Sequence, residues 1–320
     1  MSGTALLGDI GGTNARFALC RPGERPAEAV LRTGADFPAL EDAIADVLSE
    51  TGAVVEEAVL AVAGPVEQGV AELSNSPWRA DAEALRRRFG WRHCRLLNDF
   101  AANALALPLL EPGEVEAIGG GQVAAGRPKV VLGPGTGLGV AGLVPAEDGR
   151  WIAVPGEGGH SSLAGEDEYE DALISVLRRE LGHVSHESVI CGPGLLNLYR
   201  AVVEVAGPEA AAWTRQYAHS PADVTRFALQ EPGGPAGQAI AVFSRLLGAY
   251  AGDLALIYGA HGGVYLTGGV LPALGTLFDR QGFRRRFEAK GRFEDYLRAI
   301  PTLQVTAAQP GLLGLSSLLR

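Results

Sequence analysis

Short apolar runs alternate along the chain with longer amphipathic stretches. Residues 58–63 form such a run and end in a Gly-Pro turn, which predicts a buried strand. Residues 38–50 place apolar side chains at helical spacing with acidic ones opposite, which predicts an amphipathic helix. Strands that alternate with helices indicate an α/β fold, and 320 residues are enough for two lobes.

The same pattern predicts elements in both halves of the chain. We expect the charged residues 283–296 to be exposed, and we place Leu181 on the apolar face of a helix over residues 168–181. Other expected helices cover residues 81–89 with Asp81 as N-cap, 100–107, 239–258 and 310–319, and one opens within 191–198; expected strands cover residues 95–97, 262–269 and 301–305.

Two stretches share a strand–turn–strand design. Residues 6–19 read LLGDIGGTNARFAL, and residues 129–144 read KVVLGPGTGLGVAGLV. Glycines let the backbone approach a ligand closely, and successive N–H groups of such a turn can form an anion nest. The pattern favours two phosphate-binding hairpins, with ordinary glycine-rich turns as the alternative.

Asp9 stands at the mouth of the first turn. A carboxylate there would repel a bare phosphate, but it suits a phosphate that carries Mg²⁺, held directly or through water. The first hairpin therefore indicates an ATP-using enzyme.

Two other nucleotide-binding motifs are excluded. Gly137, Gly139 and Gly142 satisfy GxGxxG, but the chain runs on to Pro145 with no helix to aim at a pyrophosphate. GK[ST] does not occur, so the chain is not a P-loop NTPase. The GxSxG motif of a nucleophilic serine does not occur either.

Composition narrows the partners. The net charge is −10, with 27 basic and 37 acidic residues, which argues against nucleic acid as a partner. The three cysteines are far apart and form no CxxC, so neither a disulfide framework nor a zinc site is indicated.

No membrane partner is expected. Asp9 interrupts the only apolar stretch near the N-terminus, so no signal peptide is predicted. The apolar tract 239–260 contains Arg245 and Asp253, which favours a buried helix over a membrane span. We expect a soluble, cytoplasmic protein.

Several polar residues are candidates for chemistry. Asn98 and Asp99 end a predicted strand, where a carboxylate can act as general base; helix capping by Asp99 is the alternative that the spacing favours. Glu157 and His160 flank two glycines and could bind a polyol, with a polar surface loop as the alternative.

His183, His186 and Glu187 could bind a metal from one helical turn. No HExxH motif or nearby Cys supports a metal site. We favour a helix C-terminus for His183 and a sugar contact for Glu187, which could also be a surface acid.

The motifs in their order resemble the bacterial glucokinase family, the type without the cysteine-rich zinc motif of the related ROK group. The matching segments run from residue 6 to about 314 and read GDIGGTNARFAL, LNDFAANALALP, GPGTGLGVA, PGEGGH, CGPGLLNLYRA, TGGVLP and QPGLLG. Where the family often has a Thr-Asn pair, this chain has Ser74 and Asn75.

The resemblance implies an actin-like (ribonuclease H-like) ATPase fold, with two α/β lobes around a central cleft. A small domain would comprise residues 1–109 and 300–320, and a large domain residues 110–299. The resemblance also implies a homodimer.

The resemblance further implies that ATP with Mg²⁺ phosphorylates the 6-hydroxyl of glucose. Asp99 would be the general base, and Asp9 would organise Mg²⁺ through water. Glucose would be held by Asn98, Asp99, Glu157, His160 and Glu187, and the nucleotide by Gly8, Asp9, Gly11, Gly12, Thr13, Asn14, Gly135, Thr136, Gly137, Gly192, Gly268 and Gly269. A kinase for another hexose or phosphate donor, and a non-catalytic sugar-binding regulator, are the alternatives.

Overall fold

The computed structural model describes residues 3–73, 78–207 and 218–319. Its contacts divide the chain into two units. The first combines Met1–Val115, Ala141–Pro155 and Ala307–Arg320, and the second combines Glu116–Val140 and Gly156–Thr306. This division differs from the predicted domains chiefly because Ala141–Pro155 is grouped with the first unit.

A five-stranded sheet forms the centre of the first unit, in the order β3-β2-β1-β4-β7. β1 pairs with β2 in the antiparallel sense and with β4 in the parallel sense, and β4 continues in parallel to β7. The carboxyl ends of β1, β4 and β7 therefore lie along one edge. The strands are β1 (Thr4–Ile10), β2 (Asn14–Cys20), β3 (Val30–Thr33), β4 (Val55–Val62) and β7 (His93–Asn98).

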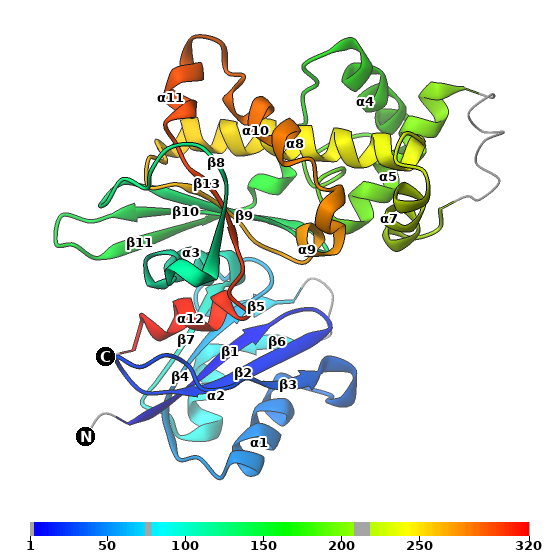
Figure 1. Cartoon of the computed structure of the whole chain (residues 1–320). Helices are drawn as coiled ribbons and strands as arrows, with labels where there is room; N and C mark the ends of the chain where they lie inside the picture. Colours follow the sequence, from blue (N-terminus) through cyan, green and yellow to red (C-terminus); the bar gives the residue numbers. More distant parts are fainter. Residues whose placement is uncertain (1–2, 74–77, 208–217, 320) are drawn as a thin grey trace. The chain divides into compact units, whose positions relative to one another are not determined.

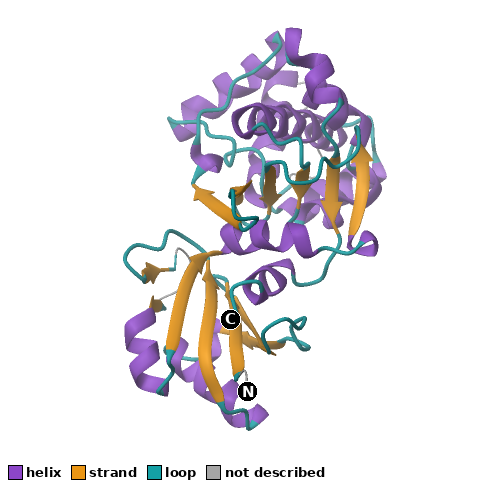
Figure 2. Cartoon of the chain, turned by 90° about the vertical axis from the view of Figure 1, so that its left-hand side faces the viewer, coloured by secondary structure: helices purple, strands orange, loops and turns teal. Residues whose placement is uncertain are grey.

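One face of this sheet packs against α1 (Leu40–Thr51) and α2 (Ala82–Phe89). Leu6 and Ile10 of β1 point to that side, because alternate residues of a strand face opposite ways, and both are fully buried. Asp81 caps α2, which confirms the predicted cap. Figure 2 shows helices on either side of the sheet.

The opposite face packs against α3 (Asp99–Ala106) and α12 (Pro310–Ser316), which lie side by side (Figure 1). Leu7 of β1 points to this side and joins a core with Leu312 and Leu315 of α12. α12 thus completes the hydrophobic core on this face of β1.

A six-stranded sheet has the order β11-β10-β9-β12-β13-β8. Every residue of β9 is buried, and β12 pairs in parallel with both β9 and β13. The strands are β8 (Val115–Gly119), β9 (Lys129–Pro134), β10 (Leu138–Pro145), β11 (Trp151–Gly156), β12 (Val264–Leu266) and β13 (Thr302–Val305).

The second unit is built around α8 (Pro235–Tyr258), the expected core helix. Among the described residues it is the one helix long and apolar enough to cross a membrane, but most of it is buried in the core. α10 (Arg280–Glu288) packs along it (Figure 1). The two helices approach closely at Gly248, where a Cβ atom would lie 2.1 Å from the Phe283 carbonyl oxygen.

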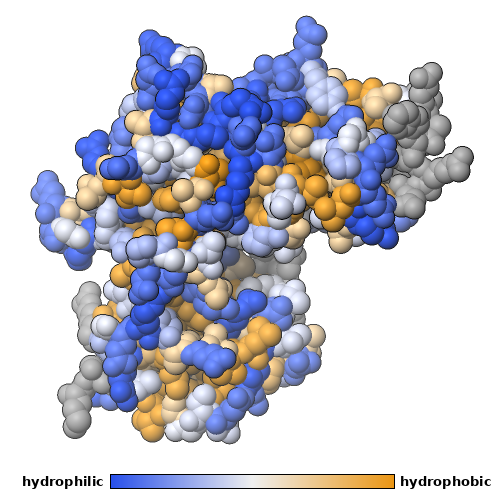
Figure 3. Space-filling view, viewed as in Figure 1, coloured by the Kyte–Doolittle hydropathy of each residue, from blue (hydrophilic) through white to orange (hydrophobic). Residues whose placement is uncertain are grey.

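The expectation that residues 283–296 are exposed is wrong for part of this segment. Phe283 and Phe287 are fully buried against α8. Arg286 is mostly buried as well, because its guanidinium donates to Glu170, a carboxylate 1% exposed, over 2.7 Å. The visible outer surface around α10 and α11 is hydrophilic (Figure 3), and Phe293 is 41% exposed, so part of the segment does face solvent as expected.

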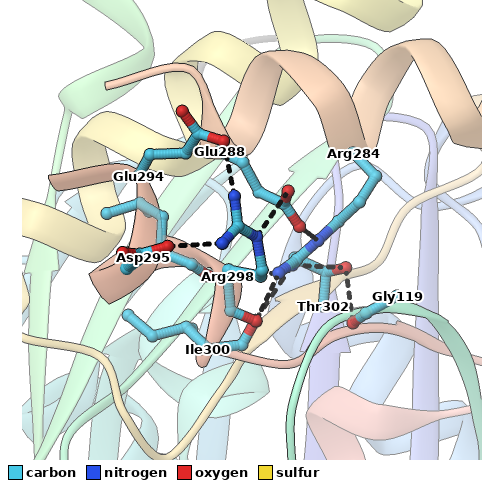
Figure 4. A network of polar contacts seen from close by, with 9 residues as sticks. Gly119, Arg284, Glu288, Glu294, Asp295, Arg298, Ile300 and Thr302 are labelled. Atoms are coloured by element: carbon cyan, nitrogen blue, oxygen red, sulfur yellow. Dashed lines mark hydrogen bonds and ion pairs between the residues drawn. The ribbon is translucent and has the colours of Figure 1, made fainter. Parts of the chain in front are cut away.

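Arg284 is also mostly buried, and its guanidinium is stabilised there by hydrogen bonds to several acceptors (Figure 4). It donates to Glu288 over 2.6 Å and to the carbonyl oxygens of Ile300 over 2.9 Å and Leu297 over 3.0 Å. Thr302, which accepts from Arg284 over 3.3 Å, donates in turn to the Gly119 carbonyl. The network fixes the start of β13 against α10.

One further apolar position departs from the predicted pattern. Leu181 is the last residue of its helix and is 44% exposed, so it does not join the apolar face as predicted. Residues 74–77, which include the predicted loop positions Ser74 and Asn75, lie outside the described residues. The other elements are β5 (Val70–Glu72), β6 (Arg79–Asp81), α4 (Glu168–Leu181), α5 (Gly192–Ala206), α7 (Pro221–Gln230), α9 (Val270–Leu274) and α11 (Glu294–Arg298).

Candidate active site

The first glycine turn joins β1 to β2, as predicted. The Gly11 amide donates to the Asn14 carbonyl over 2.9 Å, and the Thr13 carbonyl accepts from the Gly34 amide over 2.8 Å. These bonds close the turn that contains Gly12. Gly8 lies inside β1, where a Cβ atom would be 2.7 Å from Leu60, so close packing explains that glycine.

Asp9 precedes this turn and lies directly across from Arg16 on β2. Burial raises the pKa of the Asp9 carboxyl, and the positive charge of Arg16 opposes that shift. At Gly311, in the first turn of α12, a Cβ atom would lie 3.4 Å from Asp9 Oδ2 and 3.8 Å from Asn103 Oδ1. The carboxylate therefore lies next to the first turn of α12.

Asn98 and Asp99 lie at the same sheet edge as the first turn. Ile10 is in register with Val62, and Val62 with Asn98. Two strand spacings separate the end of β1 from the end of β7, about 10 Å. This is the edge of a parallel sheet at which ligands bind.

The alternative assignment of Asp99 as the helix cap is wrong, because Asn98 is the cap. The Asn98 Oδ1 atom accepts from the amides of Phe100 over 2.9 Å and Ala101 over 3.1 Å. Asp99 is the first helical residue, and its Oδ1 accepts from the Phe100 amide over 2.9 Å and from Asn98 Nδ2 over 3.1 Å. These bonds orient the carboxylate. Both Asn and Asp cap helices well, so the sequence could not choose between them.

The second glycine turn joins β9 to β10, also as predicted. The Gly135 amide donates to the Gly137 carbonyl over 2.8 Å, with Thr136 between them. The Gly135 carbonyl accepts from the Gly192 amide over 2.8 Å, and Gly192 is the first residue of α5. The helix start thus abuts the turn, and a helix N-terminus favours an anion.

Gly268 and Gly269 stand close to the end of β9. Gly268 has φ +89°, and a Cβ atom there would lie 2.5 Å from the Pro134 carbonyl oxygen. Gly269 precedes α9. Gly268 is therefore packed closely against the strand that leads into the second turn, whereas a Cβ atom at Gly269 would meet no atom within 4 Å.

The proposed sugar ligands of the second unit come from two loops that hydrogen-bond to each other. Glu157 precedes a single 3-10 turn, Gly158–His160, and Glu187 lies between α4 and α5. The Glu187 amide donates to the Gly159 carbonyl over 2.8 Å. His160 Nε2 lies 3.8 Å from Glu187 Oε1, so these two side chains are brought together as predicted.

Glu187 also contacts the second turn, which the sequence did not suggest. Its Oε2 atom accepts from the Leu138 amide over 2.7 Å. A Cβ atom at Gly137 would lie 2.5 Å from the same oxygen. The Glu187 carboxylate therefore links the two loops that carry Glu157, His160 and Glu187 to the second turn.

The segment from His183 to Glu187 is not a helical turn, so the predicted spacing does not hold. α4 ends at Leu181, two residues before His183, and His183 Nε2 lies 3.1 Å from the His160 carbonyl oxygen. His186 is buried, and burial lowers its pKa to about 4. Across the described residues, no three His, Cys, Asp or Glu side chains gather as a metal site.

All three cysteines are free thiols, in agreement with the prediction. Burial raises the pKa of Cys191 to about 11. Its Sγ accepts from the Gly194 amide over 3.2 Å and donates to the Glu187 carbonyl over 3.0 Å. Cys191 thus acts as the cap of α5.

Comparison with known sequences gives matches over the whole chain. The family model described as Glucokinase matches residues 6–320. A protein named Glucokinase from Yersinia enterocolitica is 44% identical over 324 residues, which cover 100% of this chain and 97% of that protein. A protein of the same name from Yersinia pestis is 42% identical over 323 residues, with the same coverage.

Comparison with solved structures agrees. A glucokinase from an Antarctic psychrotroph superposes with a TM-score of 0.88 at 34% identity, over 100% of this chain and 99% of that one. A ROK family glucokinase from Streptomyces griseus, in complex with glucose and AMPPNP, has a TM-score of 0.65 at 21% identity, over 99% of each chain. The second similarity shows the fold alone.

Proposed function

The chain belongs to the glucokinase family, and from this premise we propose which of its residues carry the reaction. Its fold is that of the actin-like ATPases, and its activity is phosphorylation of glucose by ATP. Transfer of a phosphoryl group depends on positioning and charge neutralisation more than on covalent chemistry. The roles below follow from that requirement.

Asp99 is the general base in this proposal. The observation that carries it is the position of Asp99 at the carboxyl edge of β7, with Asn98 capping the helix in its place. Asp99 accepts the proton of the 6-hydroxyl while that oxygen forms its bond to the γ-phosphorus and ADP leaves. Such catalysis contributes about 10²–10⁴-fold.

Asn98, Glu157, His160 and Glu187 hold the glucose hydroxyls in this proposal. Each hydroxyl donates one hydrogen bond and accepts others, so a set with carboxylates, an imidazole and an amide matches it. The 3.8 Å approach of His160 to Glu187 supports a shared sugar site in the second unit.

The two glycine turns bind the phosphates, and Gly192, Gly268 and Gly269 lie near the adenosine half in this proposal. Asp9 suits Mg²⁺ that arrives with ATP, because one carboxylate leaves most of the octahedral shell to water and phosphate oxygens. Magnesium, when bound, neutralises phosphate charge. Asp9 would hold the hydrated cation from the protein side.

We also propose the broader assignments that the family resemblance implies. Residues 1–109 with 300–320 act as the small domain and residues 110–299 as the large one. The enzyme is cytoplasmic, works in glycolysis and forms a homodimer.

The decisive test compares two aspartates at helix starts. Asp99→Ala removes the proposed base and should lower kcat by about 10²–10⁴-fold, while glucose still binds. Asp81→Ala removes the true cap of α2 and should cost about 0.5–2 kcal/mol of stability while kcat is kept. Steady-state kinetics, glucose titration and thermal melting separate these effects. Near-normal turnover by Asp99→Ala would leave Asp99 a structural residue only.

A further inference from the structure

One aromatic pair supports two loops of the second unit, which we call the sugar loops: residues 157–160 and the loop that carries Glu187. The Tyr250 ring of α8 stacks on His186, with ring centres 3.8 Å apart and planes 18° apart. We propose that Tyr250 is a positioning residue for glucose: it sets where the loops that carry Glu157, His160 and Glu187 stand. The proposal rests on the proposed sugar-binding role of those three residues.

Tyr250 contacts the first loop through its hydroxyl. A Cβ atom at Gly158 would lie 2.7 Å from Tyr250 Oη, and its next neighbours are Val140 atoms at 3.6 and 3.7 Å. The hydroxyl therefore occupies the space that a side chain at position 158 would need. Gly158 is not among the glycines with positive φ, so contact with the hydroxyl is what an alanine there would have to overcome.

His186 belongs to the loop that carries Glu187, and its backbone bonds this loop to the segment after His160. Its amide donates to the Ser161 carbonyl over 3.1 Å, and the Leu163 amide donates to the Val184 carbonyl over 2.9 Å. Together with the bond from Glu187 to Gly159, these contacts tie the two loops into one unit. A shift of one loop therefore moves the other.

The stacked pair is suited to positioning, not proton transfer. Burial lowers the pKa of His186 to about 4, so its ring is neutral near pH 7. Burial raises the pKa of Tyr250 to about 12, so its hydroxyl stays protonated. Two neutral flat rings pack without the cost of a buried charge.

The test introduces a steric clash between position 158 and Tyr250 Oη and then removes it. Gly158→Ala should displace the loop from Tyr250 Oη and raise the KM for glucose on the order of tenfold or more, because small misplacements of binding groups are costly. Tyr250→Phe alone keeps the ring that stacks on His186, so it should raise the KM for glucose less than Gly158→Ala does. The double variant Gly158→Ala/Tyr250→Phe removes the obstructing oxygen and should recover most of the loss. KM for glucose and kcat are measured for all three, with thermal melting to confirm folding.

The matched control is Tyr258→Phe, which removes a hydroxyl from the same helix about two turns away. Combined with Gly158→Ala, it should restore nothing. The proposal is overturned if Gly158→Ala leaves the KM for glucose unchanged, if Tyr250→Phe fails to restore it, or if Tyr258→Phe restores it equally well.

Two further variants separate this proposal from the one on which it rests. His186→Phe keeps a ring against Tyr250 and should keep glucose affinity, whereas His186→Ala should weaken it. His160→Ala should weaken glucose binding if the sugar site is as proposed. Unchanged affinity in His160→Ala contradicts the sugar site itself; weakened affinity without rescue by Tyr250→Phe contradicts only the role of Tyr250.

Discussion

The two glycine turns look alike in sequence but obtain their carboxylates differently. The first has its own: Asp9 belongs to the strand that enters the turn. The second has none nearby, and Glu187 supplies one from a loop about fifty residues along the chain. The contrast shows that a repeated strand–turn–strand motif can be completed by local residues in one copy and by distant residues in the other.

Because the two carboxylates come from different parts of the chain, we infer that they have different roles. Asp9 lies opposite Arg16 in the first unit, and burial raises the pKa of its carboxyl. Glu187 uses one oxygen on the Leu138 amide and lies near His160 with the other. We infer that the first turn handles cation-bearing phosphate, while the second ties nucleotide binding to sugar binding.

Of the changes at the two turns, the largest effect is expected at the first. Asp9→Asn keeps the shape but removes the charge, so the Mg²⁺ concentration for half-maximal activity should rise about 10–100-fold, as for other groups that orient a metal shell. Asp46→Asn is the control, because that carboxylate pairs with Arg32 on the surface. An unchanged magnesium requirement in Asp9→Asn would remove the distinction between the turns.

An intermediate effect is expected from Glu187. Glu187→Ala deletes the bond to Leu138, and a hydrogen bond to a charged group contributes about 1.5–3 kcal/mol, so the KM for ATP should rise about tenfold or more. Glu187→Gln keeps an oxygen that can accept from Leu138, so its KM for ATP should change less than its KM for glucose. Equal effects of both variants on ATP would show that the turn does not need this bond.

The smallest effect is expected at Gly137. A methyl group there pushes the flexible end of Glu187 away from Leu138, at a cost of about 0.5–1.5 kcal/mol, or a few-fold in the KM for ATP. In a Glu187→Ala background the oxygen is absent, so Gly137→Ala should add nothing. A full additional loss in the double variant would locate the effect of Gly137 elsewhere.

Signals that act over a few residues predicted most of the fold. Both hairpins, the Asp81 cap, the helix that opens at Gly192 and the buried α8 follow from local pattern and capping chemistry. The residues 283–296 were misjudged because their many charges obscured Phe283 and Phe287, which are one helical turn apart. Arg284 and Arg286 are mostly buried because they donate to partners outside the segment, such as the Ile300 carbonyl and Glu170.

The candidate site divides in the same way. Asp9, Asp99 and the two turns could be singled out from sequence because each lies at the end of a strand. The bond from Glu187 to Leu138 and the contact of Tyr250 with Gly158 could not, because both depend on tertiary packing between segments far apart. The assigned roles of all these residues in catalysis and binding stay predictions.

The packing of α12 against β1 has a consequence for synthesis of the protein. Leu312 and Leu315 cover the face of β1 that Leu7 presents, yet about three hundred residues separate them in the chain. At translation speeds of about 5–20 residues per second, that face waits roughly 15–60 s for its cover after β1 is made. That face of β1 is thus covered only after α12 has been made, and its apolar side chains stay exposed to other surfaces during that interval.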